Sequence, residues 1–186
     1  MLIARTRNFE KQMIVIFDRD GTLIQDYPFN VSAKKIHWLD FAKESIKILK
    51  EEGIQVVVAT NQSGIAKGKF DESELKIFHN EMNRQLSPHA QIDEFFYCPH
   101  HEDGSVAEYS FKCCCRKPGN KMVEDIKRYY HASLDNLVFI GNTETDRECA
   151  DRSGVRYFDV RHTNLQQITY EVLQLKSGNL LRSAEN

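Results

Sequence analysis

Residues 13–22 read MIVIFDRDGT, a short apolar run that ends in two carboxylates and a glycine. The run from Met13 to Phe17 consists of β-branched and other large apolar residues, which favour a buried β-strand. Asp18 and Asp20 follow this run directly, where an open parallel sheet places its ligand site. This stretch therefore predicts a strand that carries acidic side chains at its carboxyl end.

Four further apolar runs predict the other strands of a five-stranded sheet. They span residues 54–60, 92–98, 137–141 and 155–160. Between the runs, apolar residues recur with helical period within residues 39–49, 75–82, 122–129 and 165–175. Asp71 and Glu74 form a capping-box pattern before the second of these helices. Alternating strands and helices predict an α/β fold, a Rossmann-like three-layer sandwich with a mainly parallel sheet.

The length and composition fit one globular domain. The chain has 186 residues, of which 41% are hydrophobic and 28% are charged. We expect a single domain over residues 1–186 with its core in residues 12–160. Residues 177–186 lack an apolar period, so we expect a flexible tail there.

The charge and hydropathy patterns exclude several classes of partner. Twenty-seven acidic and 25 basic side chains leave a net charge of -2, so the chain is no polycation that would hold nucleic acid through its phosphates, and the net charge leaves local basic clusters open. No stretch reaches the apolar length of a membrane span, and residues 1–12 lack the apolar core of a signal peptide. We therefore expect a cytoplasmic protein with reduced thiols. No feature of the sequence indicates an obligate dimer, so we expect a monomer.

Asp18 and Asp20 have the spacing that phosphoryl transfer requires. Asp18 can attack phosphorus to form an aspartyl-phosphate, while Asp20 protonates the departing alkoxide and later deprotonates the hydrolytic water. A hard divalent cation, most naturally Mg²⁺, would offset the repulsion between the carboxylate and the phosphate. The alternative is an Asp-rich turn that serves the backbone alone.

Thr60 and the pair Arg116-Lys117 are candidate phosphate contacts. The Thr60 hydroxyl and the N–H groups that follow it can bind phosphate oxygens at the end of a strand. Two adjacent cations can hold a phosphate and offset charge in the transition state. Thr60 is also an ordinary residue to close a strand, and an Arg-Lys pair is usually solvated surface.

Four of the five cysteines lie between residues 98 and 115. Cys98 and His100 stand on one side of a loop, and residues 113–115 are three consecutive cysteines on the other. Two pairs of soft ligands that flank a loop are typical of a structural tetrahedral Zn²⁺ site. The alternatives are buried free thiols or a disulfide. Residue spacing leaves open whether Cys113 or Cys114 is the ligand.

Together, these motifs resemble those of the haloacid dehalogenase-like phosphohydrolases, whose first motif is D-x-D-G-T at the end of the first strand. The resemblance spans residues 14 to about 158. Within that superfamily, the chain is similar to the small phosphatases that act on D-glycero-D-manno-heptose 1,7-bisphosphate, with histidinol-phosphate phosphatases as near relatives. The matching segments are TNQSGIAKGKF at residues 60–70, CPHH at 98–101 and CRKP at 115–118.

The resemblance implies a role for each matching residue. Asp18 would be the nucleophile and Asp20 the general acid/base, while Thr60 and Lys117 would stabilise the transferred phosphoryl group. The implied substrate contacts are Asp26, Tyr27, Pro28, Phe29, Asn61, Gln62, Ser63 and Arg116. The implied ligands of Mg²⁺ are Asp18, the carbonyl of Asp20 and Asn142, and those of a zinc-bound loop over residues 98–115 are Cys98, His100, Cys113 and Cys115. The segment after the first motif is too short for a separate cap domain.

Asn142 departs from the pattern, because the family normally has Asp at this position. An Asn carbonyl can still coordinate Mg²⁺, but with one negative charge fewer. We therefore expect a Mg²⁺-dependent phosphatase of a small sugar phosphate, most naturally the heptose bisphosphate. The alternatives are a histidinol-phosphate phosphatase, a catalytically weakened protein that binds a sugar phosphate, and a deliberate substitution that traps a complex.

Overall fold

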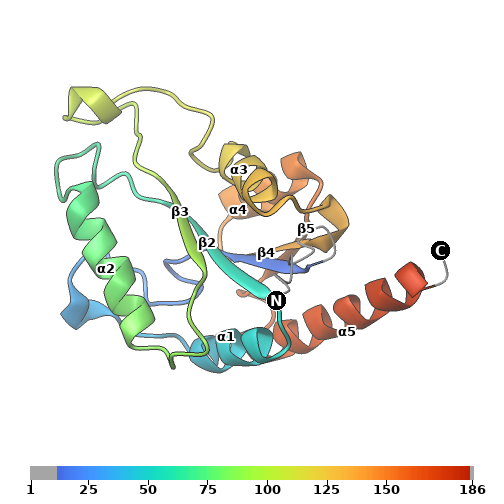
Figure 1. The fold of residues 1–186 in the computed structure, drawn as a ribbon. Helices are drawn as coiled ribbons and strands as arrows, with labels where there is room; N and C mark the ends of the chain where they lie inside the picture. Colours follow the sequence, from blue (N-terminus) through green and yellow to red (C-terminus); the bar gives the residue numbers. More distant parts are fainter. Residues whose placement is uncertain (1–11, 185–186) are drawn as a thin grey trace, which may run out of the picture.

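The computed structural model describes residues 12–184. The segment before Gln12, on which the prediction of cytoplasmic localisation partly depends, and the last two residues of the expected tail lie outside the described residues. Five strands form one sheet in the order β3-β2-β1-β4-β5, and each pair of neighbours is parallel (Figure 1). The strands are β1 (Ile14–Phe17), β2 (Gln55–Asn61), β3 (Glu94–Cys98), β4 (Leu137–Gly141) and β5 (Arg156–Asp159). The predicted five-stranded parallel sheet is therefore confirmed.

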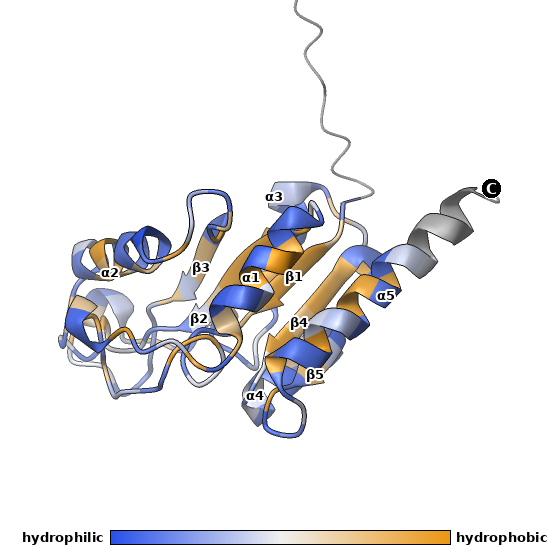
Figure 2. Ribbon diagram, turned by 90° about the horizontal axis from the view of Figure 1, so that it is seen from below, coloured by the Kyte–Doolittle hydropathy of each residue, from blue (hydrophilic) through white to orange (hydrophobic). Residues whose placement is uncertain are grey.

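Helices cover both faces of this sheet, as the three-layer prediction requires. They are α1 (Ala42–Glu51), α2 (Glu72–Arg84), α3 (Lys121–Tyr130), α4 (Glu144–Ser153) and α5 (Leu165–Ala184). Val15 and Phe17 of β1 belong to a core that includes residues of α1, α2 and α5, whereas Ile14 and Ile16 belong to a core with residues of α3 and α4. Figure 2 shows the apolar strands behind α1 and α5. Each fully buried aliphatic side chain of β1 stabilises the fold by about 1.5–3 kcal/mol.

Local sequence signals explain where two of these helices begin. Asp71 accepts a hydrogen bond from Glu74 N at 2.8 Å, and Glu74 accepts one from Asp71 N at 3.0 Å, so the predicted capping box is confirmed. Thr143 and Asp146 form a second capping box at the start of α4. No apolar period predicted α4, because Cys149 and Ala150 are its only buried apolar residues.

Helix α5 continues to Ala184, through most of the segment in which we expected a flexible tail. Once a helix exists, each added residue gains a hydrogen bond at little cost, so the helix extends without an apolar face. The flexibility of the tail and the domain limits stay predictions. Between β1 and α1 the chain contains a single short helical turn (Ala33–Lys35) and isolated bridges, so no cap domain is inserted there. Among the described helices, none has both the length and the apolar composition needed to cross a membrane.

Candidate active site

Three adjacent strands bring the polar residues of the candidate site together. β1 lies between β2 and β4, and parallel strands end at the same edge of the sheet. Asp18 follows β1, Thr60 stands near the end of β2, and Asn142 follows β4. Lys117 reaches the same edge from the loop after β3. The strand order, which places these ends side by side, therefore assembles the site.

Lys117 is the cation at the centre of this group. Its Nζ lies 2.6 Å from Asp18 Oδ1 and 2.6 Å from Asp146 Oδ1, and it donates to the carbonyl of Ala59 at 2.8 Å. The Lys117 side chain is only 2% exposed, so its charge needs these partners. Two of these contacts are hydrogen bonds, to Asp18 and Ala59, and the third, to Asp146, is an ion pair. Lys117 is therefore fixed beside Asp18.

Burial and neighbouring charges shift the pKa values of Asp18 and Lys117. Burial raises the pKa of Asp18 to about 7, an effect that the Lys117 ammonium opposes and the Asp146 carboxylate reinforces. Burial alone would lower the pKa of Lys117, but the two carboxylates raise it above its ordinary value. The ammonium therefore stays charged, as a group that offsets phosphoryl charge must.

Asp20 is held by two neighbours. Arg19 Nε and Nη2 donate to both carboxylate oxygens at 2.9–3.2 Å. Gln62 Nε2 donates to Asp20 Oδ2 at 3.0 Å and to Thr60 Oγ1 at 2.9 Å. Gln62 therefore connects the expected acid/base to the expected phosphate contact. Arg19 was not among the predicted site residues, although its place between two aspartates was a signal.

Most of the expected substrate contacts line one pocket of about 130 Å³ beside Asp20. These residues are Asp26, Tyr27, Phe29, Asn61, Gln62 and Ser63. Arg116 instead lines a neighbouring pocket of about 500 Å³, which Lys117 also lines, and Arg116 Nη1 is buried there without a hydrogen-bond partner. Pro28 is exposed and lines neither of these two pockets. The contacts of these residues with a substrate stay predictions.

Asn61 also binds the backbone of Lys117. Its Oδ1 accepts from Lys117 N at 2.9 Å, and its Nδ2 donates to Lys117 O at 3.1 Å. An amide that pairs with both polar groups of one residue fixes that residue in two directions. Asn61 therefore positions the backbone from which the Lys117 ammonium extends.

Asn142 packs against the turn that follows β1. Its Oδ1 accepts from the Thr22 hydroxyl at 3.1 Å. Gly21 has φ +77°, and a Cβ at this position would lie 2.2 Å from Asn142 Nδ2. Gly21 is thus required both for its backbone conformation and for the close approach of Asn142.

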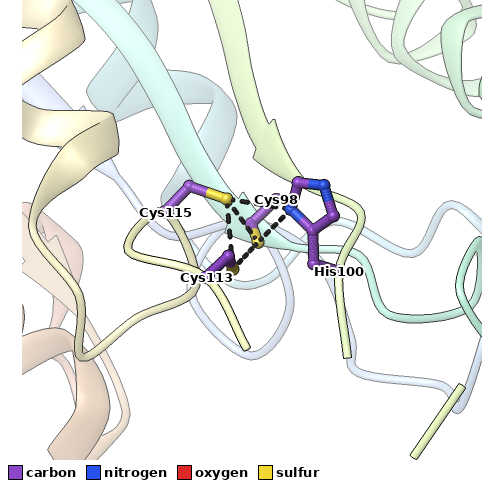
Figure 3. A group of neighbouring side chains, drawn as sticks. All are labelled: Cys98, His100, Cys113 and Cys115. Carbon is purple, nitrogen blue, oxygen red and sulfur yellow. Dashed lines mark hydrogen bonds between the residues drawn. The ribbon is translucent and has the colours of Figure 1, made fainter. Parts of the chain in front are cut away.

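The sulfur and nitrogen atoms of four side chains form a cluster next to the site (Figure 3). The ligand atoms of Cys98, His100, Cys113 and Cys115 all lie within 4.8 Å of one another. Cys114 is exposed and is not part of this cluster. Three thiols and an imidazole are a donor set that suits a tetrahedral zinc ion.

The cluster connects two segments of the chain. Cys98 ends β3, and His100 follows it, whereas Cys113 and Cys115 lie directly before Arg116 and Lys117. The backbone N–H of Arg116 donates to Cys113 Sγ at 3.4 Å. A metal in this cluster would therefore fix the backbone that presents the two cations.

The chain is similar in sequence to one protein family and to several curated phosphatases. The family described as polynucleotide kinase 3 phosphatase matches residues 13–171. The chain is 33% identical over 142 residues to D-glycero-beta-D-manno-heptose-1,7-bisphosphate 7-phosphatase of Escherichia coli (strain K12), covering 76% of this chain and 74% of the relative. It is 28% identical over 169 residues to the Rhodopseudomonas palustris protein of the same name, covering 90% and 94% of the two chains.

A solved structure agrees with these sequence relatives. The D,D-heptose 1.7-bisphosphate phosphatase from B. bronchiseptica, complexed with magnesium and phosphate, superposes with a TM-score of 0.74 at 29% identity. The match covers 88% of this chain and 99% of that one. Similarity therefore extends over the sheet, both helical layers and the candidate site.

Proposed function

Because the chain belongs to the polynucleotide kinase 3 phosphatase family and is a haloacid dehalogenase-like phosphoric monoester hydrolase, we propose that its substrate is a small phosphorylated sugar. The sugar we propose is D-glycero-D-manno-heptose 1,7-bisphosphate, on which the relatives named above act. The observation that carries the chemistry is the Lys117 ammonium, 2.6 Å from Asp18 at the end of β1, together with the hydrogen bonds by which Gln62 joins Asp20 to Thr60. The net charge of -2 argues against a polynucleotide substrate.

In the mechanism we propose, Asp18 attacks phosphorus and the bond from phosphorus to the sugar oxygen breaks. Asp20 gives its proton to that oxygen, so the sugar leaves as an alcohol. Asp20 then takes a proton from water, and the resulting hydroxide attacks the aspartyl-phosphate, which releases inorganic phosphate and restores Asp18. Lys117 and the Thr60 hydroxyl offset the charge on the phosphoryl oxygens throughout.

The oxygen atoms at the site suit a Mg²⁺ ion. The donors would be the Asp18 carboxylate, the Asp20 carbonyl and Asn142 Oδ1, and hard oxygen ligands are those that Mg²⁺ prefers. Asn142 Oδ1 accepts one hydrogen bond from Thr22, and an amide oxygen has a second lone pair. When bound, the ion would supply positive charge that offsets the repulsion of the phosphate by the Asp18 carboxylate.

We also propose that Cys98, His100, Cys113 and Cys115 hold a structural Zn²⁺ ion. The proximity of their ligand atoms and the exposed position of Cys114 support this set. With four protein ligands the ion would have no open position, so it would organise the loop and take no part in the chemistry. We further propose that the enzyme acts as a cytoplasmic monomer.

The test measures phosphate release from heptose 1,7-bisphosphate, heptose 7-phosphate and histidinol phosphate while Mg²⁺ is titrated, with this chain and Asn142→Asp in parallel. We expect both proteins to hydrolyse the bisphosphate, and Asn142→Asp to require less Mg²⁺ because the substitution restores a negative charge. Turnover by the variant alone would make this chain a sugar-phosphate-binding protein. Preference for histidinol phosphate would change the substrate, and inactivity of both proteins on all three compounds would reject the proposal.

A further inference from the structure

Arg19 is a charged side chain inside the protein. It is 1% exposed, and its guanidinium carbon lies 4.8 Å from the centre of the Phe78 ring. Its Nε and Nη2 donate to both oxygens of Asp20, whose side chain is 21% exposed. A planar guanidinium that contacts both oxygens fixes the plane of a carboxylate, which a single hydrogen bond does not.

His79 holds Arg19 from the opposite side. Arg19 Nη1 lies 3.2 Å from His79 Nε2. A guanidinium has only donors, so Nε2 accepts and the proton of the neutral ring is on Nδ1. Burial, with the charge of Arg19, lowers the pKa of His79 to about 2, which agrees with a neutral acceptor.

The orientation of His79 is itself fixed by the fold. His79 lies on α2, and its ring stacks on Phe95 of β3 at a centroid distance of 4.1 Å and an interplanar angle of 12°. The ring can therefore not turn away from Arg19 without losing this contact. Contacts thus run without a break from β3 and α2 through Arg19 to Asp20.

We propose that His79 and Arg19 are positioning residues that hold the carboxyl group of Asp20 in the orientation from which its protonated form transfers a proton to the departing sugar oxygen. The inference rests on the proposed function, since it needs Asp20 as the general acid. His79 acts through Arg19, and Arg19 acts through its hydrogen bonds to Asp20. Without His79, the Nη1 hydrogens of Arg19 lose an acceptor inside the protein, and the guanidinium can turn away from Asp20 to find another.

Substrates whose leaving groups differ in their need for a proton distinguish a positioning role of His79 from a merely structural one. A sugar alkoxide needs a proton as it leaves, whereas p-nitrophenolate leaves without one. A misplaced Asp20 therefore slows the hydrolysis of an alkyl phosphate more than that of p-nitrophenyl phosphate. A protein that is simply less folded loses both activities equally.

The experiment compares His79→Leu, His79→Gln and Met82→Leu. For His79→Leu we expect kcat to fall about tenfold on the sugar or alkyl phosphate that the wild type hydrolyses fastest, and less than about threefold on p-nitrophenyl phosphate, with little change in KM. His79→Gln should recover most of the loss, because its side-chain oxygen can accept from Arg19. Met82→Leu is the control, a buried residue of the same helix and core, and should retain both activities.

Equal losses on both substrates, or no recovery with His79→Gln, would overturn the positioning role while leaving the proposed function in place. A wild-type protein without phosphatase activity on any of these compounds would overturn both. Nitrogen-15 NMR of the wild-type imidazole tests the contact apart from turnover. We expect an unprotonated Nε2 at pH 7 whose resonance shifts in Arg19→Lys, and a protonated Nε2 would contradict the inferred contact.

Discussion

The Lys117 ammonium lies 2.6 Å from a carboxylate oxygen of Asp18 and 2.6 Å from one of Asp146. Because Asp146 would remain as a partner of Lys117, a substitution of Asp18 should affect activity more than stability. We expect Asp18→Asn to abolish phosphate release without unfolding the protein. The amide is a poor nucleophile, yet Lys117 keeps Asp146 and the Ala59 carbonyl as partners. Phosphate release and thermal unfolding check the two halves of this prediction. A variant that retains substantial turnover would remove Asp18 from its role.

His79 makes the stability of the protein depend on pH. Its pKa is lowered from 6.5 to about 2, first by burial and then by Arg19, so the unfolded chain binds a proton that the folded protein does not. The stability that comes from keeping His79 neutral is therefore fully present above pH 6.5, and it is lost as the pH falls toward the pKa of His79 in the folded protein. Below about pH 6, wild type should lose up to about 1.4 kcal/mol of unfolding free energy per pH unit more than His79→Gln.

Urea unfolding at several pH values between 7.5 and 4.5 measures this difference. The comparison with His79→Gln cancels the contributions of the other titrating groups, which the two proteins share. If the two curves of stability against pH run parallel, His79 is not the neutral buried group described above.

The two capping boxes have the same local structure but differ in their relation to the candidate site. The capping box of α4 contains Asp146, which contacts Lys117, whereas among the described residues the capping box of α2 has no hydrogen bond to a residue of the site. Asp71→Ala should cost about 1 kcal/mol of unfolding free energy and leave kcat unchanged. Thr143→Ala should cost a similar amount but also lower kcat, since the Thr143 hydroxyl donates to Asp146 Oδ2 at 2.7 Å and Asp146 pairs with Lys117. Unfolding curves and kcat for both variants give the test. Equal effects on kcat would mean that the α4 cap has no special link to Lys117.

The cysteine cluster gives a second prediction at the level of elements. Removal of the metal proposed for this cluster with a strong chelator should lower phosphate release and expose residues 99–120 to protease, because the cluster joins the end of β3 to the segment before Lys117. Cys115→Ser should have the same effect. Cys114→Ser is the control and should retain both metal and activity. Metal analysis and limited proteolysis of the variants test this prediction. Loss of zinc from Cys114→Ser would show that Cys114 is a ligand of the ion.

The sequence predicted most of the fold because β1, β2 and β4 are buried on both faces and therefore appear as continuous apolar runs. No apolar period predicted helix α4, since charged residues fill most of its sequence. The placement of Asp18 and Thr60 follows from strand order, so their proximity could be anticipated.

Other features of the site depend on contacts that no local pattern contains. Arg19 and His79 are 60 residues apart, and a fully buried arginine is rare enough that its burial could not be anticipated. The Asn61 side chain and the Lys117 backbone to which it binds are 56 residues apart. These contacts become visible only when the whole molecule is assembled.

A ribosome releases β1 long before β4, although the two strands are neighbours in the finished sheet. Thr22 and Asn142, which hydrogen-bond to each other, are 120 residues apart. Folding during synthesis proceeds from the N-terminus onward. β1 can therefore pair with β2 before β4 has been synthesised, and the other edge of β1 stays unpaired until then. An unpaired strand edge attracts the edges of other chains. We therefore expect the nascent protein to be most exposed to aggregation after Asp18, the proposed nucleophile, has been synthesised and before β4 completes the edge of the sheet that carries the candidate site.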